Sequence, residues 1–349
     1  MTKQNTVLGW DVGGAHLKAA LVKADGQALH VVQVACPLWR GINELHSAID
    51  VVLTQLQPVP GRHAVTMTGE LADIFPDRNS GVRQIVDAMT RHLQCAPLFY
   101  AGASGLVSAA DTSQHLAGIA SANWLASADF VAAQVEHGLF IDIGSTTADF
   151  VLLSDGRPKN RGFTDAERMQ YEELVYTGVV RTPLMSLASR IPFAGEWQPL
   201  AAEYFATTAD VYRLTGDLNE ADDMAETADG AGKTLQDSAR RLARMIGRDL
   251  NDAPTSAWIE LAQSFKQLQL NRLQDAALRC YSRGLIDRQA PLIGAGAGSF
   301  LIRALAKQLD RDYRDVSALI AGNTHDARHW AAMCLPAYAV ACHAARAAA

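Results

Sequence analysis

Apolar residues recur along the chain with two different spacings, and the presence of both predicts an α/β protein. Apolar runs bounded by turn-forming residues predict strands, and apolar residues three and four positions apart predict helices. The expected strands of the first part are 6–12, 17–23, 29–35, 63–68 and 96–100. The expected helices there are 42–56, 80–93 and about 115–134. Asp25-Gly26 is a strong tight-turn signal between two of these strands.

The pattern then starts again. Residues 138–143 and 148–154 predict a second pair of strands, followed by another Asp-Gly turn at 155–156. In both copies an apolar strand ends in Asp-x-Gly and a small polar turn, with Asp11 in the first copy and Asp142 in the second. This internal repeat predicts two lobes, 1–136 and 137–349. The second lobe would carry a mostly helical insertion at about 165–288, after which a strand (290–294) and a helix (300–309) return.

Composition narrows the class of protein. The chain has 349 residues, 49% of them hydrophobic and 19% charged, which indicates a soluble globular protein with room for two cores. A net charge of -6 argues against a general nucleic-acid or membrane-surface binder. The sequence shows neither a signal peptide nor an apolar run long enough to span a bilayer, and its five dispersed cysteines predict reduced thiols. We therefore expect a cytoplasmic protein that acts on small molecules, and a homodimer remains open.

The first Asp-x-Gly hairpin, at residues 9–18, has the composition of an anion-binding turn. Gly13 and Gly14 let backbone N–H groups approach an anion without a Cβ in the way. Asp11 can hold a hydrated Mg²⁺ against that anion, and Lys18 on the return strand can supply a point charge. A purely structural hairpin with a glycine-rich turn would have the same sequence pattern, so one copy alone would not favour an anion-binding function. The presence of two copies favours that function.

The second hairpin, at residues 140–149, repeats the motif with added hydroxyl groups. Asp142 ends the strand, and the turn consists of Gly144, Ser145, Thr146 and Thr147. Asp149, just beyond the turn, is a candidate second carboxylate on the metal side. The alternative is a Ser/Thr-rich turn with a capping aspartate. The length and order of the motif favour phosphate binding.

A third candidate is the glycine-rich loop between the late strand and its helix. It contains Gly294, Gly296 and Gly298. Such a loop suits close approach of a ligand at a helix N-terminus. In addition, Glu70 follows the strand 63–68, at the edge where clefts open in α/β sheets.

Other motifs are ambiguous. Arg78 and Arg181 can clamp phosphate oxygens, or they can form surface ion pairs. Residues 232–234 resemble the end of a P-loop, but no strand precedes them and a chance match is favoured. Asp222 and Glu226 would share a helix face and could bind Mg²⁺ with a diphosphate, although a solvated acidic face is commoner.

Taken together, the motifs resemble the actin/hexokinase/Hsp70 superfamily in its hydantoinase–oxoprolinase branch. The chain is similar, over essentially its full length, to the tetrahydromethanopterin-linked C1-transfer pathway protein family. The motifs that carry this resemblance are residues 68–73, 142–149, 176–178 and 181–183. The resemblance implies a duplicated actin-like ATPase (ribonuclease H-like) fold with two lobes, a central cleft and a helical insertion in the second half.

The same resemblance implies a reaction, because the family includes the methanofuran-biosynthesis synthase of methanogens. That enzyme joins an aminomethylfuran-methyl diphosphate to the phenol oxygen of a γ-glutamyl-tyramine unit and releases diphosphate. Bacterial relatives would make methylofuran, with a tyrosine-type phenol. On this hypothesis Asp11 and Asp142 hold Mg²⁺, directly or through water, and Glu70 or Asp149 accepts the phenol proton. The phosphate oxygens would be held by Lys18, Ser145, Thr146 and nearby backbone N–H groups.

Two other functions fit the same loops. An ATP-dependent small-molecule kinase would bind ATP phosphates at the two turns and the adenosine at residues 294–298, whereas the transferase does not require ATP. A nucleotide sensor or scaffold would bind nucleotide without turnover.

Overall fold

The computed structural model describes residues 6–57, 61–93 and 95–347, which form two compact units. The first unit comprises the described residues up to His137, Leu153–Glu167, and the described residues from Asp315 onward. The second comprises Gly138–Leu152 and Arg168–Arg314. Within the described ranges, no helix is both long and apolar enough to cross a membrane.

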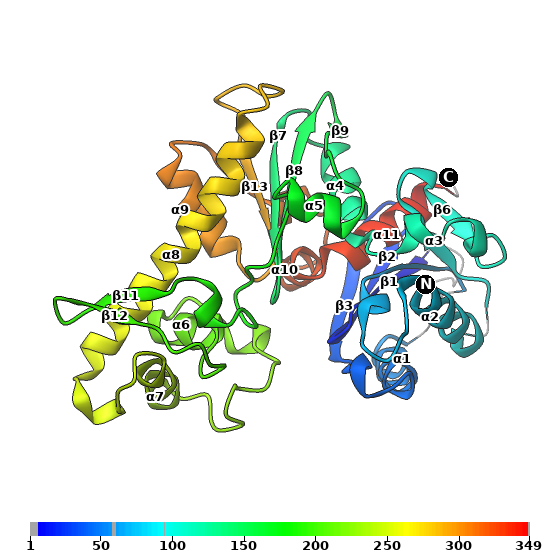
Figure 1. The fold of residues 1–349 in the computed structure, drawn as a ribbon. Helices are drawn as coiled ribbons and strands as arrows, with labels where there is room; N and C mark the ends of the chain where they lie inside the picture. The colour runs from blue at the N-terminus through cyan, green and yellow to red at the C-terminus, as the bar shows by residue number, and fades with distance from the viewer. Residues whose placement is uncertain (1–5, 58–60, 94, 348–349) are drawn as a thin grey trace. The chain divides into compact units, whose positions relative to one another are not determined.

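The first unit is built on a six-stranded sheet in the order β3-β2-β1-β4-β5-β6 (Figure 1). Its strands are β1 (Thr6–Val12), β2 (His16–Lys23), β3 (Ala28–Ala35), β4 (His63–Met67), β5 (Leu98–Tyr100) and β6 (Leu106–Ser108). The first three are antiparallel, whereas β4 runs parallel to β1 and β5 runs parallel to β4. Because parallel neighbours end at the same edge, Asp11 of β1 lies beside Thr66 of β4 at that edge.

Helices cover both faces of this sheet. On one face α1 (Asn43–Gln55) and α2 (Arg78–Leu93) form a core with alternate residues of β1, among them Trp10. On the other face lies α11 (Leu335–Arg346), which also packs against α4 (Asn123–Ala132). The approach of α11 is close, because a Cβ on Gly9 would lie 2.0 Å from the carbonyl oxygen of Ala337. The remaining elements of this unit are α3 (Leu116–Ile119), α10 (His325–Met333) and β9 (Arg157–Pro158), which pairs with the end of β8.

The sheet of the second unit has the order β10-β8-β7-β13-β14. Its strands are β7 (Gly138–Ile143), β8 (Ala148–Ser154), β10 (Leu174–Val175), β13 (Leu292–Ala295) and β14 (Tyr313–Asp315). β13 runs parallel to β7, as β4 runs parallel to β1. A strand, its hairpin partner and a parallel third strand therefore recur in both units, as expected for a duplicated fold.

Three α-helices lie in the chain between β10 and β13. They are α6 (Thr208–Thr215), α7 (Leu235–Met245) and α8 (Thr255–Tyr281), preceded by α5 (Asp165–Gln170) and followed, after β13, by α9 (Ser299–Gln308). The small hairpin of β11 (Arg190–Phe193) and β12 (Glu196–Pro199) lies among them. Apolar side chains of α8 join the core of the unit. A buried ion pair links α6 to α7, with Arg241 bonded to Asp210 at 2.8 Å.

Three expectations from the sequence differ from the structure. The single helix expected at 115–134 is two helices, because Ser121 between them has a left-handed φ of 51°. The region 165–288 contains three short strands besides its helices. The described residues from Asp315 onward, expected in the second lobe, belong instead to the first unit, because α11 packs on β1.

Candidate functional site

The two Asp-x-Gly turns have the same internal geometry. In the first, the N–H of Gly13 donates to the carbonyl of His16 at 3.0 Å, and in the second the N–H of Gly144 donates to that of Thr147 at 2.9 Å. The first turn is tight at Gly13, where a Cβ would lie 2.9 Å from that carbonyl oxygen, while a Cβ on Gly14 would meet nothing within 4 Å. The duplication seen in the sequence is thus also a duplication of backbone shape.

In the first unit, Asp11 is almost fully buried at the end of β1. Lys18 faces it from β2, with 3.8 Å between Lys18 Nζ and Asp11 Oδ2. Burial raises the pKa of Asp11, although the charge of Lys18 and a hydrogen bond with Asn123 both oppose the shift. Asp11 Oδ1 and the hydroxyl of the neighbouring Thr66 have no hydrogen-bond partner among the described residues. Buried oxygens in this state are places for a water molecule or a cation.

The oxygens at Asp11 suit Mg²⁺, which binds through hard oxygen ligands. Within the described ranges, no group of three or more His, Cys, Asp or Glu side chains is arranged to hold a metal ion. A magnesium ion would therefore need water and phosphate oxygens as its other ligands, which is its usual mode of binding in phosphate sites. Within the first unit, Asp11 could offer such an ion a single carboxylate contact.

Glu70 lies in a buried chain of polar groups in the first unit. It is 1% exposed, and its Oε1 accepts a hydrogen bond from Ser121 Oγ at 2.7 Å. Ser121 Oγ also lies 3.3 Å from Asp165, which is bonded to Arg78 at 2.6 Å. Burial raises the pKa of Glu70, and Glu70 Oε2 has no partner in the described part of the chain. Arg78 therefore forms an ion pair here.

In the second unit, the glycine-rich loop lies directly against the second turn. Ala295 pairs with Asp142, and the N–H of Gly298 donates to the carbonyl of Ile143 at 2.8 Å. At Gly296 the φ is +79°, and a Cβ would lie 2.4 Å from Asp142 Oδ1. Glycine is therefore required at this position both by conformation and by space. The loop leads into the N-terminus of α9, where a negative group is favoured.

Gly294 has a different role from the other two glycines. It is buried, and a Cβ there would lie 2.7 Å from the ring of Tyr313. Its small size therefore serves packing between β13 and β14, and it does not line the turn.

The segment 177–182 completes the surroundings of the second turn. Val179 N–H donates to the carbonyl of Gly144, and the N–H groups of Val180 and Arg181 both donate to the carbonyl of Ser145. A Cβ on Gly178 would lie 2.4 Å from the backbone of Ser145, so the two segments are in direct contact. The Arg181 side chain is exposed. The structure thus brings Asp142, the 144–147 turn, Arg181 and the 296–298 loop together.

Asp149, a candidate proton acceptor, is in an ion pair. Arg168 donates to it at 2.8 Å and also to the carbonyl of Glu173 at 2.9 Å. The side chain of Arg168 is only 2% exposed, and that of Asp149 is 19% exposed. Asp149 takes in the second hairpin the position of Lys18 in the first, so the charge opposite the strand-end aspartate is reversed between the copies.

The second unit combines the elements of an anion site. Ser145, Thr146 and Thr147 are all partly exposed, in a turn whose shape is held by neighbouring backbone groups. Hydroxyl groups, turn N–H groups, an exposed arginine and a helix N-terminus all favour phosphate. The sequence analysis missed three residues that contact the candidate side chains: Asn123 at Asp11, Ser121 at Glu70 and Arg168 at Asp149.

Two further motifs differ from the ligand-binding arrangements considered for them in the sequence. Residues 223–226 are not helical, so Asp222 and Glu226 do not share a helix face. Asp223 forms ion pairs with Arg213 and with Lys233, at 3.4 Å for Lys233. Thr234 caps α7 by accepting a hydrogen bond from the N–H of Asp237. Residues 232–234 therefore precede a capped helix and do not form a phosphate loop.

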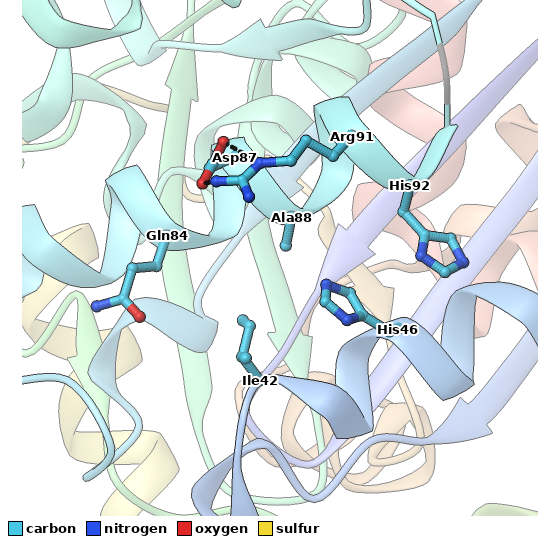
Figure 2. Close-up of a pocket in the computed structure, with 7 residues that line it drawn as sticks. All are labelled: Ile42, His46, Gln84, Asp87, Ala88, Arg91 and His92. Atoms are coloured by element: carbon cyan, nitrogen blue, oxygen red, sulfur yellow. Dashed lines mark hydrogen bonds and ion pairs between the residues drawn. The ribbon is translucent and has the colours of Figure 1, made fainter.

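A cavity of about 320 Å³ opens beside α1 and α2 of the first unit (Figure 2). It is lined by residues of α1 and α2 and by Ile42. The rings of His46 and His92 stack there with centroids 5.3 Å apart, and His92 is bonded to Asp50 at 2.8 Å. Neither Asp-x-Gly turn contributes to it.

Comparison with known proteins places these features in context. The family model described as Hydantoinase/oxoprolinase matches residues 62–319. The chain is 30% identical over 269 residues to the (4-{4-[2-(gamma-L-glutamylamino)ethyl]phenoxymethyl}furan-2-yl)methanamine synthase of Methanocaldococcus jannaschii, covering 76% of this chain and 79% of that protein. It is also 30% identical over 145 residues to the synthase of the same name from Methanococcus vannielii, covering 41% of this chain and 65% of that protein.

Among solved structures, nucleotide-free acetone carboxylase is similar with a TM-score of 0.52 and 10% identity, over 88% of this chain and 67% of that one. This likeness concerns the fold alone. Together with the sheet order of the two units, it confirms the expected duplicated actin-like α/β fold.

Proposed function

The chain belongs to the hydantoinase/oxoprolinase family, and on that premise we propose that it is a transferase of methanofuran or methylofuran biosynthesis. The reaction would join an aminomethylfuran-methyl diphosphate to the phenol oxygen of a tyramine or tyrosine unit, with release of diphosphate. The observation that carries this proposal is the similarity to the Methanocaldococcus synthase, whose name describes a phenoxymethyl-furan product.

The bond changes define what the protein must do. The phenol oxygen forms a bond to the furan-methyl carbon, the bond from that carbon to diphosphate breaks, and diphosphate leaves with the electron pair. A furan stabilises positive charge on the attached carbon, so this bond can break early. The protein then has two tasks, which are to stabilise the leaving diphosphate and to accept the phenol proton.

The second unit supports the first task. Ser145, Thr146 and Thr147 would donate to phosphate oxygens from a turn held by segment 177–182, and Arg181 would add positive charge. Donors already fixed in place before the reaction cost no reorganisation when charge develops on the leaving group.

In the first unit Asp11 is the proposed contact for Mg²⁺, and Lys18 adds a positive charge beside it. In the second unit the proposed contact is Asp142, beside the 144–147 turn. Bound to the diphosphate, the ion would supply neutralisation of its negative charge.

For the second task we favour Glu70 over Asp149. Burial raises the pKa of Glu70, and its Oε2 has no partner within the described ranges, so this oxygen is available for a proton. Asp149 faces Arg168, and a neighbouring cation weakens a carboxylate as a proton acceptor.

The test is a reaction with the furan-methyl diphosphate, Mg²⁺ and either γ-glutamyl-tyramine or tyrosine, in which diphosphate and the ether product are both measured. We expect stoichiometric formation of the two. Asp11→Ala should abolish diphosphate release, whereas Asp326→Ala, at a side chain that is 93% exposed, should not change it. Near-normal turnover by the Asp11 variant would refute its assignment.

The alternative function is an ATP-dependent kinase, favoured by the loop 296–298 beside Asp142 at the start of α9. The same assay separates the two, because a kinase would convert ATP to ADP and release no diphosphate from the furan substrate. Nucleotide binding without either product would indicate a sensor.

A further inference from the structure

The carbonyl of Gly178 is the centre of a buried hydrogen-bond cluster in the second unit. Three side chains donate to this oxygen: Thr208 Oγ1 at 2.9 Å, Gln269 Nε2 at 2.9 Å and Thr182 Oγ1 at 3.1 Å. Thr208 and Gln269 are both fully buried, and Thr182 is 3% exposed. One backbone carbonyl therefore receives donors from three separate parts of the fold.

Gln269 is unusual for its place in α8. Its neighbours on the buried stripe of this helix are apolar, and they include Phe265 and Leu273. A fully buried amide costs free energy unless both of its ends are satisfied. Here both are, because Gln269 Oε1 accepts from the hydroxyl of Tyr212 while Nε2 donates to Gly178. Since a tyrosine hydroxyl donates here to the oxygen, the amide can present only its nitrogen to Gly178.

The cluster is one residue away from the second turn. Directly after Gly178, the N–H groups of Val179, Val180 and Arg181 donate to the carbonyls of Gly144 and Ser145. Gly178 itself contacts the backbone of Ser145 and Thr146 so closely that it has no room for a Cβ. A displacement of Gly178 would therefore displace the turn.

We propose that Gln269 is a positioning residue for the phosphate turn 144–147. Gln269 holds the Gly178 carbonyl in place. The three N–H groups that follow Gly178 then fix the carbonyls of Gly144 and Ser145, so that the hydroxyl groups of the turn keep their arrangement. This positioning role extends the transferase function proposed above and rests on it, because its second test measures diphosphate binding. It also makes α8 part of the support of the anion site.

The first test is amide hydrogen exchange without ligand, comparing Gln269→Met with the native chain. We expect the amides of Gly144 and of 179–181 to exchange about tenfold faster in the variant, the factor that loss of one buried hydrogen bond typically produces. Gln267→Met is the matched control, because Gln267 is an exposed residue of the same helix bonded to Asn271. Its exchange at these amides should equal that of the native chain.

The second test is titration with inorganic diphosphate and Mg²⁺, well below the melting temperature. We expect Gln269→Met to bind about tenfold more weakly and to raise KM for the furan diphosphate more than it lowers kcat. Thr208→Val, which removes a different donor to Gly178, should show the same two effects if Gln269→Met fails to fold. Tyr212→Phe should show them in weaker form.

The outcomes separate the two proposals. Native exchange rates at Gly144 and 179–181 in both Gln269→Met and Thr208→Val would overturn the positioning role. Faster exchange in the variants, combined with no diphosphate binding by the native chain, would uphold the positioning role and refute the diphosphate site. Faster exchange with an unchanged affinity for diphosphate would show that the turn is held by Gln269 but does not bind the phosphate, which overturns the inference as stated.

Discussion

Replacement of Asp149 by asparagine would leave one of the most buried cations of the chain without its carboxylate. The side chain of Arg168 is 2% exposed and bonds Asp149 at 2.8 Å. Removing one partner of a buried ion pair typically costs about 3 to 5 kcal/mol, because the remaining charge stays desolvated. Here Arg168 keeps its bond to the Glu173 carbonyl, and Asp149 is 19% exposed. We therefore expect a smaller loss, about 2 to 3 kcal/mol.

Thermal unfolding measures this loss. For a protein of this size a change of 1 kcal/mol shifts the melting temperature by about 2 to 4 °C, so Asp149→Asn should melt roughly 4 to 12 °C below the native chain. The matched control is Asp155→Asn, which breaks an exposed ion pair with Lys159 and should cost at most about 1 kcal/mol. Asparagine tolerates the left-handed φ of 56° at that position.

The double variant Asp149→Asn/Arg168→Met decides between a structural and a catalytic role for Asp149. Removal of both charges should recover most of the lost stability, because an apolar replacement of a buried pair is often neutral. If Asp149 acts only on Arg168, diphosphate release by the double variant should recover as well. Recovery of the melting temperature without recovery of turnover would make Asp149 the proton acceptor. A single variant that melts within 1 °C of the native chain would refute the reasoning about the ion pair.

Three other predictions follow from close contacts and burial. Gly178→Ala should shift the 145–146 backbone by about 1 Å and lower diphosphate release on the order of 100-fold, whereas Gly61→Ala, with open space at its Cβ, should have native kinetics. Gly9→Ala should destabilise the first unit by about 1 to 3 kcal/mol in urea unfolding, because its Cβ would overlap the backbone of α11, and an unchanged midpoint would contradict this packing. Glu70→Gln should raise the melting temperature at pH 8 and lose that gain near pH 4. Burial raises the pKa of Glu70 above its ordinary value of 4.5, so ionisation of Glu70 destabilises the folded state as the pH rises above 4.5. An equal gain in melting temperature at pH 4 and pH 8 would argue against this raised pKa.

Local patterns were sufficient to predict the strands on either side of both turns. The strands β1, β2, β7 and β8 follow from apolar runs that end at Asp-x-Gly, and the turn geometry follows from glycine and small polar residues. These features depend on residues that are near one another in sequence.

The partners of the candidate side chains were not predictable, because they come from distant parts of the chain. Asp149 and Glu70 look equivalent in the sequence as acids near a strand end. In the structure Asp149 faces the buried Arg168, while Glu70 accepts a hydrogen bond from Ser121, fifty-one residues away. Gln269 gives no local signal either, since a single glutamine on a helix is ordinary until the helix face around it proves to be buried.

The packing of α11 on β1 has a consequence for biosynthesis. The ribosome makes β1 long before it makes α11, the helix that covers one face of β1 against Gly9. At about 5 to 20 residues per second, more than 300 intervening residues leave that face unprotected for roughly 15 to 65 seconds. The nascent first unit therefore cannot complete its packing until α11 has been made. During that interval the sheet face that α11 covers, on β1, β2 and β4, stays exposed and is a natural substrate for chaperones. A chain released early would keep this face exposed.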